Sequence, residues 1–131
     1  MVVGDGSYKE KLLKKLEEEE IDYIYMSFQP FNRYLELLSN AVFFGLLSNK
    51  ESYPQSVNEA NAIGVPVVIA KPWGFNFAER KRTLIVDTFT EARKIAQVVH
   101  KFILRAKNEE KSKVPTWNEV TLKYLEIIYK S

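Results

Sequence analysis

The stretch from residue 41 to residue 70 constrains the fold more than any other part of the chain. Residues 41–47 are almost entirely apolar, residues 54–62 resemble a helix, and β-branched residues dominate 65–70. Gly64 stands before the last segment, where a glycine ends a helix in the left-handed conformation. Apolar strands without alternation on either side of a helix are typical of a parallel sheet that is covered on both faces. The pattern therefore predicts an α/β domain with a Rossmann-like parallel sheet and helices on both faces.

The rest of the chain repeats this alternation of strands and helices. Further strands are expected at residues 1–3, 22–28 and 83–86, and helices at 8–20, 33–39, 88–106 and 116–129. We expect Asn32 to cap the second helix. Thr88–Glu91 and Thr116–Glu119 have the spacing of capping boxes, which open the last two helices. Residues 71–82 are interpreted as a loop.

Composition limits the function classes. The 131 residues carry a net charge of +2, which gives no general attraction to nucleic acid or to an anionic membrane. The chain has no cysteine, and one histidine, His100, cannot build a histidine metal site alone. We expect His100 to lie on a helix surface or to be structural. No apolar run approaches a membrane span and no signal peptide is recognisable, so the default expectation is a single cytoplasmic domain over residues 1–131.

Two acids are placed where an α/β domain binds ligands. Glu51 follows the apolar run 41–47, and Glu59 lies within the next helix. In an open parallel sheet, the loops after the strands line the ligand crevice, and a helix that starts there offers free N–H groups to a phosphate. We therefore expect both carboxylates to point into one cleft at the carboxyl ends of the strands, although two surface acids would show the same spacing.

The predicted loop 71–82 contains unusual residues. Its aromatic residues are Trp73, Phe75 and Phe77. One interpretation is that they cover the ligand site or face a missing domain, and the alternative is that they pack onto the sheet edge. Arg80-Lys-Arg82 is within reach of a phosphate, but we interpret it as a solvated loop.

Several motifs together resemble the C-terminal, donor-binding domain of the family 4 retaining glycosyltransferases, which have the GT-B fold. They occur in the family's order over nearly the whole chain, as Gly4-Asp-Gly6, Ser48, Glu51-Ser-Tyr-Pro, Glu59-Ala60, Gly64-Val-Pro-Val-Val68, Leu84-Ile-Val-Asp87 and Thr116-Trp-Asn-Glu-Val120. The resemblance implies that the chain is the C-terminal half of a GT-B fold and binds a nucleotide-diphosphate sugar.

The resemblance also implies roles for particular residues. Glu51 would be the catalytic residue that faces the donor sugar, and Glu59 would accept hydrogen bonds from the ribose hydroxyls. Phe28 and Gln29 would border the base through the main chain of the turn 27–29. The helix start would hold the sugar or diphosphate through the backbone N–H groups around Ser52, Tyr53, Pro54, Gln55 and Ser56. A GT-B enzyme needs neither metal nor cofactor, because the nucleotide sugar is its substrate.

The chain departs from the family in three places. From the resemblance, we expect residues 1–131 to lack the first strand-loop-helix unit, which would lie ahead of Met1 and carry an Arg and a Lys for the leaving diphosphate. We expect them to lack the acceptor-binding N-terminal domain too, and any peripheral membrane association would occur only through that domain. The family's Gly-Gly loop is replaced by Lys71-Pro-Trp-Gly-Phe-Asn-Phe77. We therefore expect this domain to need an N-terminal domain or partner subunit and to be inactive alone.

Two other interpretations stay open. One is a degenerate, stand-alone α/β domain that binds a nucleotide or a protein without catalysis. The other is an unrelated receiver or flavodoxin-type domain. A receiver needs clustered acids after its first strand, whereas Asp5 stands alone there.

Overall fold

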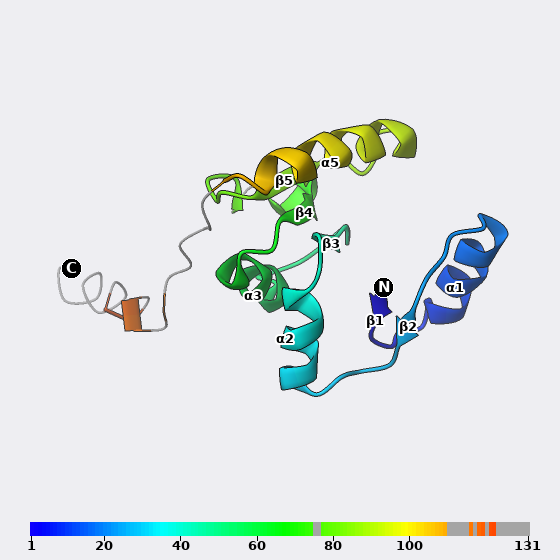
Figure 1. Cartoon of the computed structure of the whole chain (residues 1–131), viewed down its shortest axis with the longest axis horizontal. Helices are drawn as coiled ribbons and strands as arrows, with labels where there is room; N and C mark the ends of the chain where they lie inside the picture. The colour runs from blue at the N-terminus through cyan, green and yellow to red at the C-terminus, as the bar shows by residue number, and fades with distance from the viewer. Residues whose placement is uncertain (75–76, 110–115, 117, 120, 123–131) are drawn as a thin grey trace. The chain divides into compact units, whose positions relative to one another are not determined.

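The computed structural model describes residues 1–74, 77–109, 116, 118–119 and 121–122. The chain forms two compact units, residues 1–37 and 38–131. The elements are, in chain order, β1 (Val2–Val3), α1 (Lys9–Glu18), β2 (Tyr25–Met26), α2 (Phe31–Ser39), β3 (Phe44–Leu46), α3 (Gln55–Ile63), β4 (Val67–Ala70), α4 (Lys71–Gly74), β5 (Thr83–Val86) and α5 (Ala92–Ala106) (Figure 1).

The first unit contains a parallel strand pair connected by a helix. β1 pairs with β2 in the register Val2 to Tyr25, and α1 connects the two strands. Gly4 follows β1 with a φ of 115°, a conformation that L-residues rarely adopt. The turn predicted for Gly4-Asp-Gly6 is therefore confirmed.

The second unit contains a parallel sheet with the strand order β3-β4-β5. β4 lies in the centre and all four of its residues are buried. Val68 pairs with Gly45 on one side and with Leu84 on the other. Parallel strands that alternate with helices confirm the predicted α/β class.

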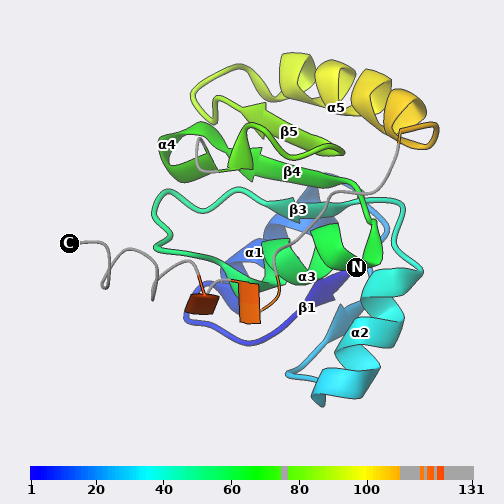
Figure 2. The same ribbon diagram turned by 90° about the vertical axis from the view of Figure 1, so that its left-hand side faces the viewer.

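Helices cover both faces of this sheet. Val68 and Val86 pack with Phe102 and Ala106 of α5 in one buried cluster. On the opposite face of β4, the side chain of Ile69 lies against α4, where a Cβ added at Gly74 would approach it to 3.1 Å. α3 contacts β3 and β4. Figures 1 and 2 show α5 and α3 on opposite sides of β4.

Several predicted boundaries are wrong. The strands expected at 22–28, 41–47 and 65–70 extend only over the shorter β2, β3 and β4, because β-forming residues continue past the positions that pair with a neighbouring strand. Residues 71–82 are not all loop. β4 runs directly into α4, which has Pro72 in its first turn, where a proline costs the helix no hydrogen bond.

The predicted caps have mixed outcomes. Asn32 does not cap α2, which already begins at Phe31. The Thr88 box is wrong as well, because α5 begins after Glu91 without a side-chain cap. The Thr116 box is confirmed: Glu119 accepts hydrogen bonds from Thr116, and the Thr116 hydroxyl accepts the N–H of Glu119 at 3.2 Å. The later inward positions predicted for that helix, Val120, Tyr124, Leu125 and Ile128, lie outside the described residues.

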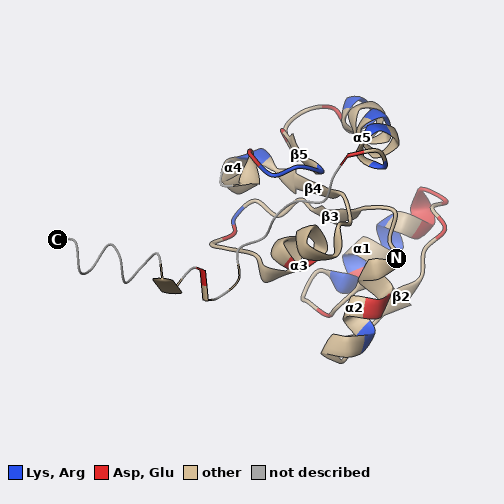
Figure 3. Ribbon diagram, turned by 60° about the vertical axis from the view of Figure 1, so that its left-hand side comes forward, with Lys and Arg blue, Asp and Glu red and all other residues tan. Residues whose placement is uncertain are grey.

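The exposed helix faces carry the charges. On α1, Lys14 and Lys15 form i,i+4 ion pairs with Glu18 and Glu19, which confirms a solvated face. α5 carries Lys and Arg along its length (Figure 3). α1 has no buried residue, and Tyr8 beside it is 73% exposed. The apolar side predicted for α1 is therefore only partly covered.

Candidate functional site

The first candidate acid lies in the loop after β3. Glu51 is half-buried, and its Oε1 accepts a 2.7 Å hydrogen bond from the hydroxyl of Ser48. β3 ends at Leu46, so both residues follow the carboxyl end of a strand in a parallel sheet. This is the edge at which open α/β sheets bind ligands. The hydrogen bond restricts the orientation of the Glu51 carboxylate.

The second candidate acid lies on α3. Pro54 precedes the helix with extended backbone angles, and its side chain makes no capping hydrogen bond. The first N–H groups of a helix have no partner within it, so those of Gln55 and Ser56 are available to a ligand. Glu59 is half-buried and lies one turn further, on the same side of α3. Among the described residues, Glu59 has no hydrogen bond or ion pair.

An aromatic cluster packs beside the Glu51 loop. The indole Nε1 of Trp73 donates a 2.7 Å hydrogen bond to the carbonyl of Ser48. Phe77 is 1% exposed and stacks on Tyr53, with a ring-centroid distance of 5.7 Å. Of the two alternatives for these aromatics, packing is therefore correct for Trp73 and Phe77, while Phe75 lies outside the described residues.

Arg80 joins this cluster to α3. Its guanidinium donates to Oδ1 of Asn58 at 2.6 Å and to Oδ1 of Asn61 at 3.1 Å. It also reaches the Tyr53 hydroxyl at 3.3 Å and lies 4.6 Å above the Phe77 ring. Arg80 is therefore half-buried and bound by other side chains, so the prediction of a solvated loop is wrong for it.

Arg82 is likewise held by the protein. Its side chain donates to the carbonyls of Gly64 and Glu109, and its φ is 56°. The prediction of a solvated loop is wrong for this residue as well. Both arginines satisfy backbone or amide oxygens along α3 and at its end.

Asp5 connects two turns in the first unit. Its carboxylate accepts hydrogen bonds from the hydroxyl of Tyr25, from Nζ of Lys9 and from the backbone N–H of Phe28. The Tyr25 hydroxyl, followed by Lys9 and the Phe28 N–H, holds the pKa of Asp5 below its ordinary value of 3.8. Asp5 thus ties the turn after β1 to the turn after β2.

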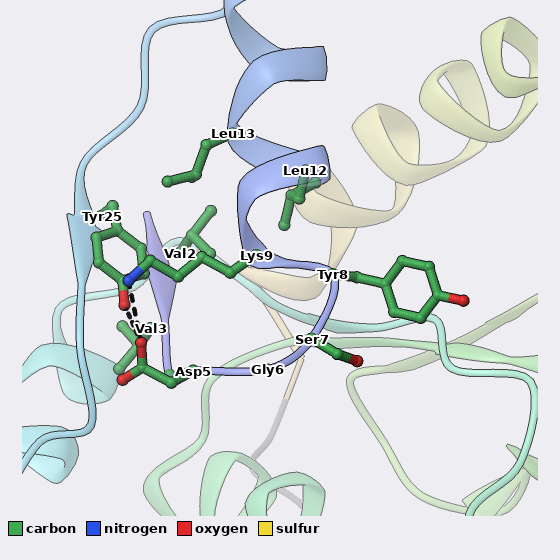
Figure 4. Close-up of a pocket in the computed structure, with 11 residues that line it drawn as sticks. Val2, Val3, Asp5, Gly6, Ser7, Tyr8, Lys9, Leu12, Leu13 and Tyr25 are labelled. Atoms are coloured by element: carbon green, nitrogen blue, oxygen red, sulfur yellow. Dashed lines mark hydrogen bonds and ion pairs between the residues drawn. The ribbon is translucent and has the colours of Figure 1, made fainter.

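A pocket of about 370 Å³ lies beside this network. Figure 4 shows Lys9 and Tyr25 pointing toward Asp5 at one end of it. The turn residues 4–9 and β1 form one wall, and Leu12 and Leu13 of α1 form another. None of the residues predicted to bind the donor lines this pocket.

The turn 27–29, which is predicted to border the nucleotide base, uses several of its backbone groups in hydrogen bonds within the protein. The N–H of Phe28 donates to Asp5, and the carbonyls of Ser27 and Phe28 accept hydrogen bonds from Nε2 of Gln29. The ring of Phe28 is 82% exposed. A ligand that reaches this turn would therefore meet an aromatic ring more readily than a free amide.

A comparison against protein families assigns the chain to a family. Residues 1–114 match the family described as Glycosyl transferases group 1. The chain belongs to this family. The match includes β1 to β5 and α5, so every candidate residue named above lies within a glycosyl transferase group 1 domain. A search among curated proteins found no match.

The described residues of this glycosyl transferase domain include no group of three or more His, Cys, Asp or Glu side chains that could hold a metal ion. No described helix is long and apolar enough to cross a membrane. His100 is exposed on α5, as expected for a surface residue.

Sequence reasoning missed the contacts of three residues, Asp5 in the first unit and Trp73 and Arg80 in the second. Apart from Lys9, which binds Asp5, their hydrogen-bond partners lie 19 to 27 residues away in the sequence. One signal was present: Asn58 and Asn61 interrupt the buried side of α3, and buried amides need partners.

Proposed function

We propose that this domain binds a nucleotide-diphosphate sugar for retaining glycosyl transfer. The observation that carries the proposal is the Ser48–Glu51 loop at the carboxyl end of β3, followed directly by α3, in a group 1 glycosyl transferase domain. The family implies a nucleotide-sugar donor. The free N–H groups at the start of α3 suit its diphosphate.

Each acid has a distinct role in this proposal. A carboxylate accepts hydrogen bonds only, so Glu59 holds two neighbouring ribose hydroxyls. Glu51, oriented by Ser48, faces the donor sugar near the reacting carbon. The N–H groups around Ser52 to Ser56 hold the diphosphate, and the turn at Phe28 and Gln29 borders the base.

We further propose that residues 1–131 are a single donor-binding domain that needs an N-terminal domain or partner subunit. Two observations support this. α1 buries none of its residues, and the first unit exposes large apolar side chains, among them Phe28 and Phe31 at 82% and 59%. The leaving diphosphate also requires positioned positive charge for transfer. We therefore expect weak donor binding and no turnover by this chain alone.

NMR titration of the chain with UDP, GDP and ADP tests the binding. We expect amide signals of residues 52–59 to move with at least one nucleotide.

Glu59→Gln should weaken that binding by about 1–3 kcal/mol, the cost of losing hydrogen bonds to a charged group. Glu51→Gln is the matched control and should leave nucleotide affinity unchanged, but reduce transfer once a partner domain is supplied. Equal nucleotide affinity of Glu59→Gln and the natural chain would reject the ribose role, and turnover by the isolated chain would reject the need for a partner.

A further inference from the structure

The segment after β4 holds the Glu51 loop from one side. We call its described residues, 71–74 and 77–82, the strap. Trp73 and Phe77 of the strap are 6% and 1% exposed, so they are part of the core. Their rings meet edge to face, with centroids 6.1 Å apart. The strap is therefore a packed element rather than a free loop.

The strap contacts both ends of the Glu51 loop. Trp73 Nε1 donates to the Ser48 carbonyl at 2.7 Å, and Phe77 stacks on Tyr53. Arg80 then binds the Tyr53 hydroxyl and the two asparagines of α3. The loop that carries Glu51 is consequently held near both of its ends, at Ser48 and Tyr53, by residues of the strap.

Ser48 transmits the Trp73 contact to the carboxylate. Its carbonyl accepts the indole N–H, while its hydroxyl donates to Glu51 Oε1 at 2.7 Å. A hydroxyl rotates freely unless its backbone and its acceptor are both held. A reacting group on a loop needs supporting contacts to keep a defined position and orientation. The two hydrogen bonds of Ser48 provide such contacts for the Glu51 carboxylate.

We propose that Trp73 is a positioning residue for Glu51, acting through Ser48, and that it sets how tightly the domain holds the sugar part of its donor. This inference rests on the proposed function, in which Glu51 faces the sugar. In this inference, the orientation of Glu51 depends on the indole N–H of Trp73 as well as on its ring. A purely structural Trp73 would need only its ring against Phe77.

The variants separate these two roles. Trp73→Phe keeps an aromatic ring beside Phe77 and removes the donor to Ser48 together with part of the buried indole. Ser48→Ala removes the hydroxyl donor to Glu51 and leaves Trp73 and its carbonyl acceptor in place. Ser48→Thr keeps the hydroxyl and is the conservative control. All are made in the whole 131-residue chain, and thermal unfolding identifies any variant that fails to fold.

The first measurement compares UDP with UDP-glucose, and GDP with GDP-mannose, by NMR titration. We expect Trp73→Phe and Ser48→Ala to weaken sugar-nucleotide binding by about two- to tenfold, the equivalent of one neutral hydrogen bond. Binding of the free diphosphates should stay within about twofold, and Ser48→Thr should resemble the natural chain. Equal loss for free and sugar-linked nucleotides, or no loss for either, would overturn the positioning role.

The second measurement needs no ligand. The ¹³C signal of the Glu51 carboxyl should move in Trp73→Phe and in Ser48→Ala, and stay in place in Ser48→Thr. An unmoved signal in Trp73→Phe would overturn the inference even if the domain binds nucleotide sugars. Failure of the natural chain to bind any nucleotide would instead reject the proposed function, while the carboxyl signal would still decide whether Trp73 positions Glu51. If Trp73→Phe does not fold, Trp73→Met, which also lacks a donor to the Ser48 carbonyl, takes its place in both measurements.

Discussion

The guanidinium of Arg80 donates a 2.6 Å hydrogen bond to Oδ1 of Asn58. The same nitrogen reaches Oδ1 of Asn61, which is fully buried. Nδ2 of Asn61 has no partner among the described residues. Arg80 therefore satisfies amide oxygens on the inner side of α3 that would otherwise be buried without a donor.

Arg80→Met should destabilise the domain by about 1–3 kcal/mol, because the amide oxygens of Asn58 and Asn61 lose their donor. Urea unfolding measures the difference. Adding Asn58→Leu and Asn61→Leu should restore much of it, since both sides of the interaction are then apolar. Lys101→Met, on the exposed side of α5, is the control and should change little. An Arg80→Met domain as stable as the natural one would contradict this account.

Gly64→Ala should cost about 1–2 kcal/mol, because Gly64 ends α3 with a φ of 91° and Ala is strained there. The left-handed angle lets the N–H of Val65 donate to the carbonyl of Ala60 at 2.9 Å, a bond that an Ala in the helical region would not preserve. Thermal unfolding is the measurement. Gly45→Ala is the matched control, because a Cβ there meets only the Phe43 ring at an ordinary 3.5 Å. Equal effects of the two changes would show that the backbone angle at residue 64 does not matter.

Phe102→Ala should destabilise the second unit by about 3–5 kcal/mol, because the ring is 4% exposed and packs on Val68 and Val86. Leu104→Ala removes apolar atoms from the same helix at a position that is 57% exposed. It should cost much less. Chemical denaturation of both variants measures the difference in stability. A similar loss of stability in the two variants would contradict the assignment of Phe102 to the side of α5 that faces the core.

The network at Asp5 should respond to acid. Since the folded-state pKa of Asp5 lies below its ordinary value of 3.8, its stabilising contribution is present above that value and is lost as the pH falls through the folded pKa. A ¹³C titration of the Asp5 carboxyl should give a midpoint below 3.8. Tyr25→Phe should raise that midpoint, because the Tyr25 hydroxyl is the largest cause of the shift.

Tyr23→Phe is the control for this titration. The Tyr23 hydroxyl donates to Glu17 and not to Asp5, so its removal should leave the Asp5 midpoint in place. The backbone amide of Phe28 reports the same event, because it donates to Asp5. An Asp5 midpoint that is unmoved in Tyr25→Phe would contradict the network.

Local sequence predicted those parts of the structure that depend on neighbouring residues. The alternation of apolar strands and amphipathic helices predicted the α/β class, because a strand that is buried on both faces consists of consecutive apolar residues. Gly64 predicted the end of α3, and the Thr116 box predicted its own hydrogen bonds with Glu119. The order of the elements also predicted Glu51 after β3, because a residue's place along the chain needs no tertiary information.

Only the tertiary structure decided how the candidate site is held. Trp73 reaches Ser48 across 25 positions, Arg80 reaches Asn58 across 22, and Asp5 reaches Phe28 across 23. No local pattern specifies such contacts, because they exist only after the strands have paired and brought distant segments together. The Thr88 box is wrong for a local reason: the carbonyl and the carboxylate of Asp87 accept the N–H groups of Thr90 and Phe89 in a turn, and α5 begins only after Glu91.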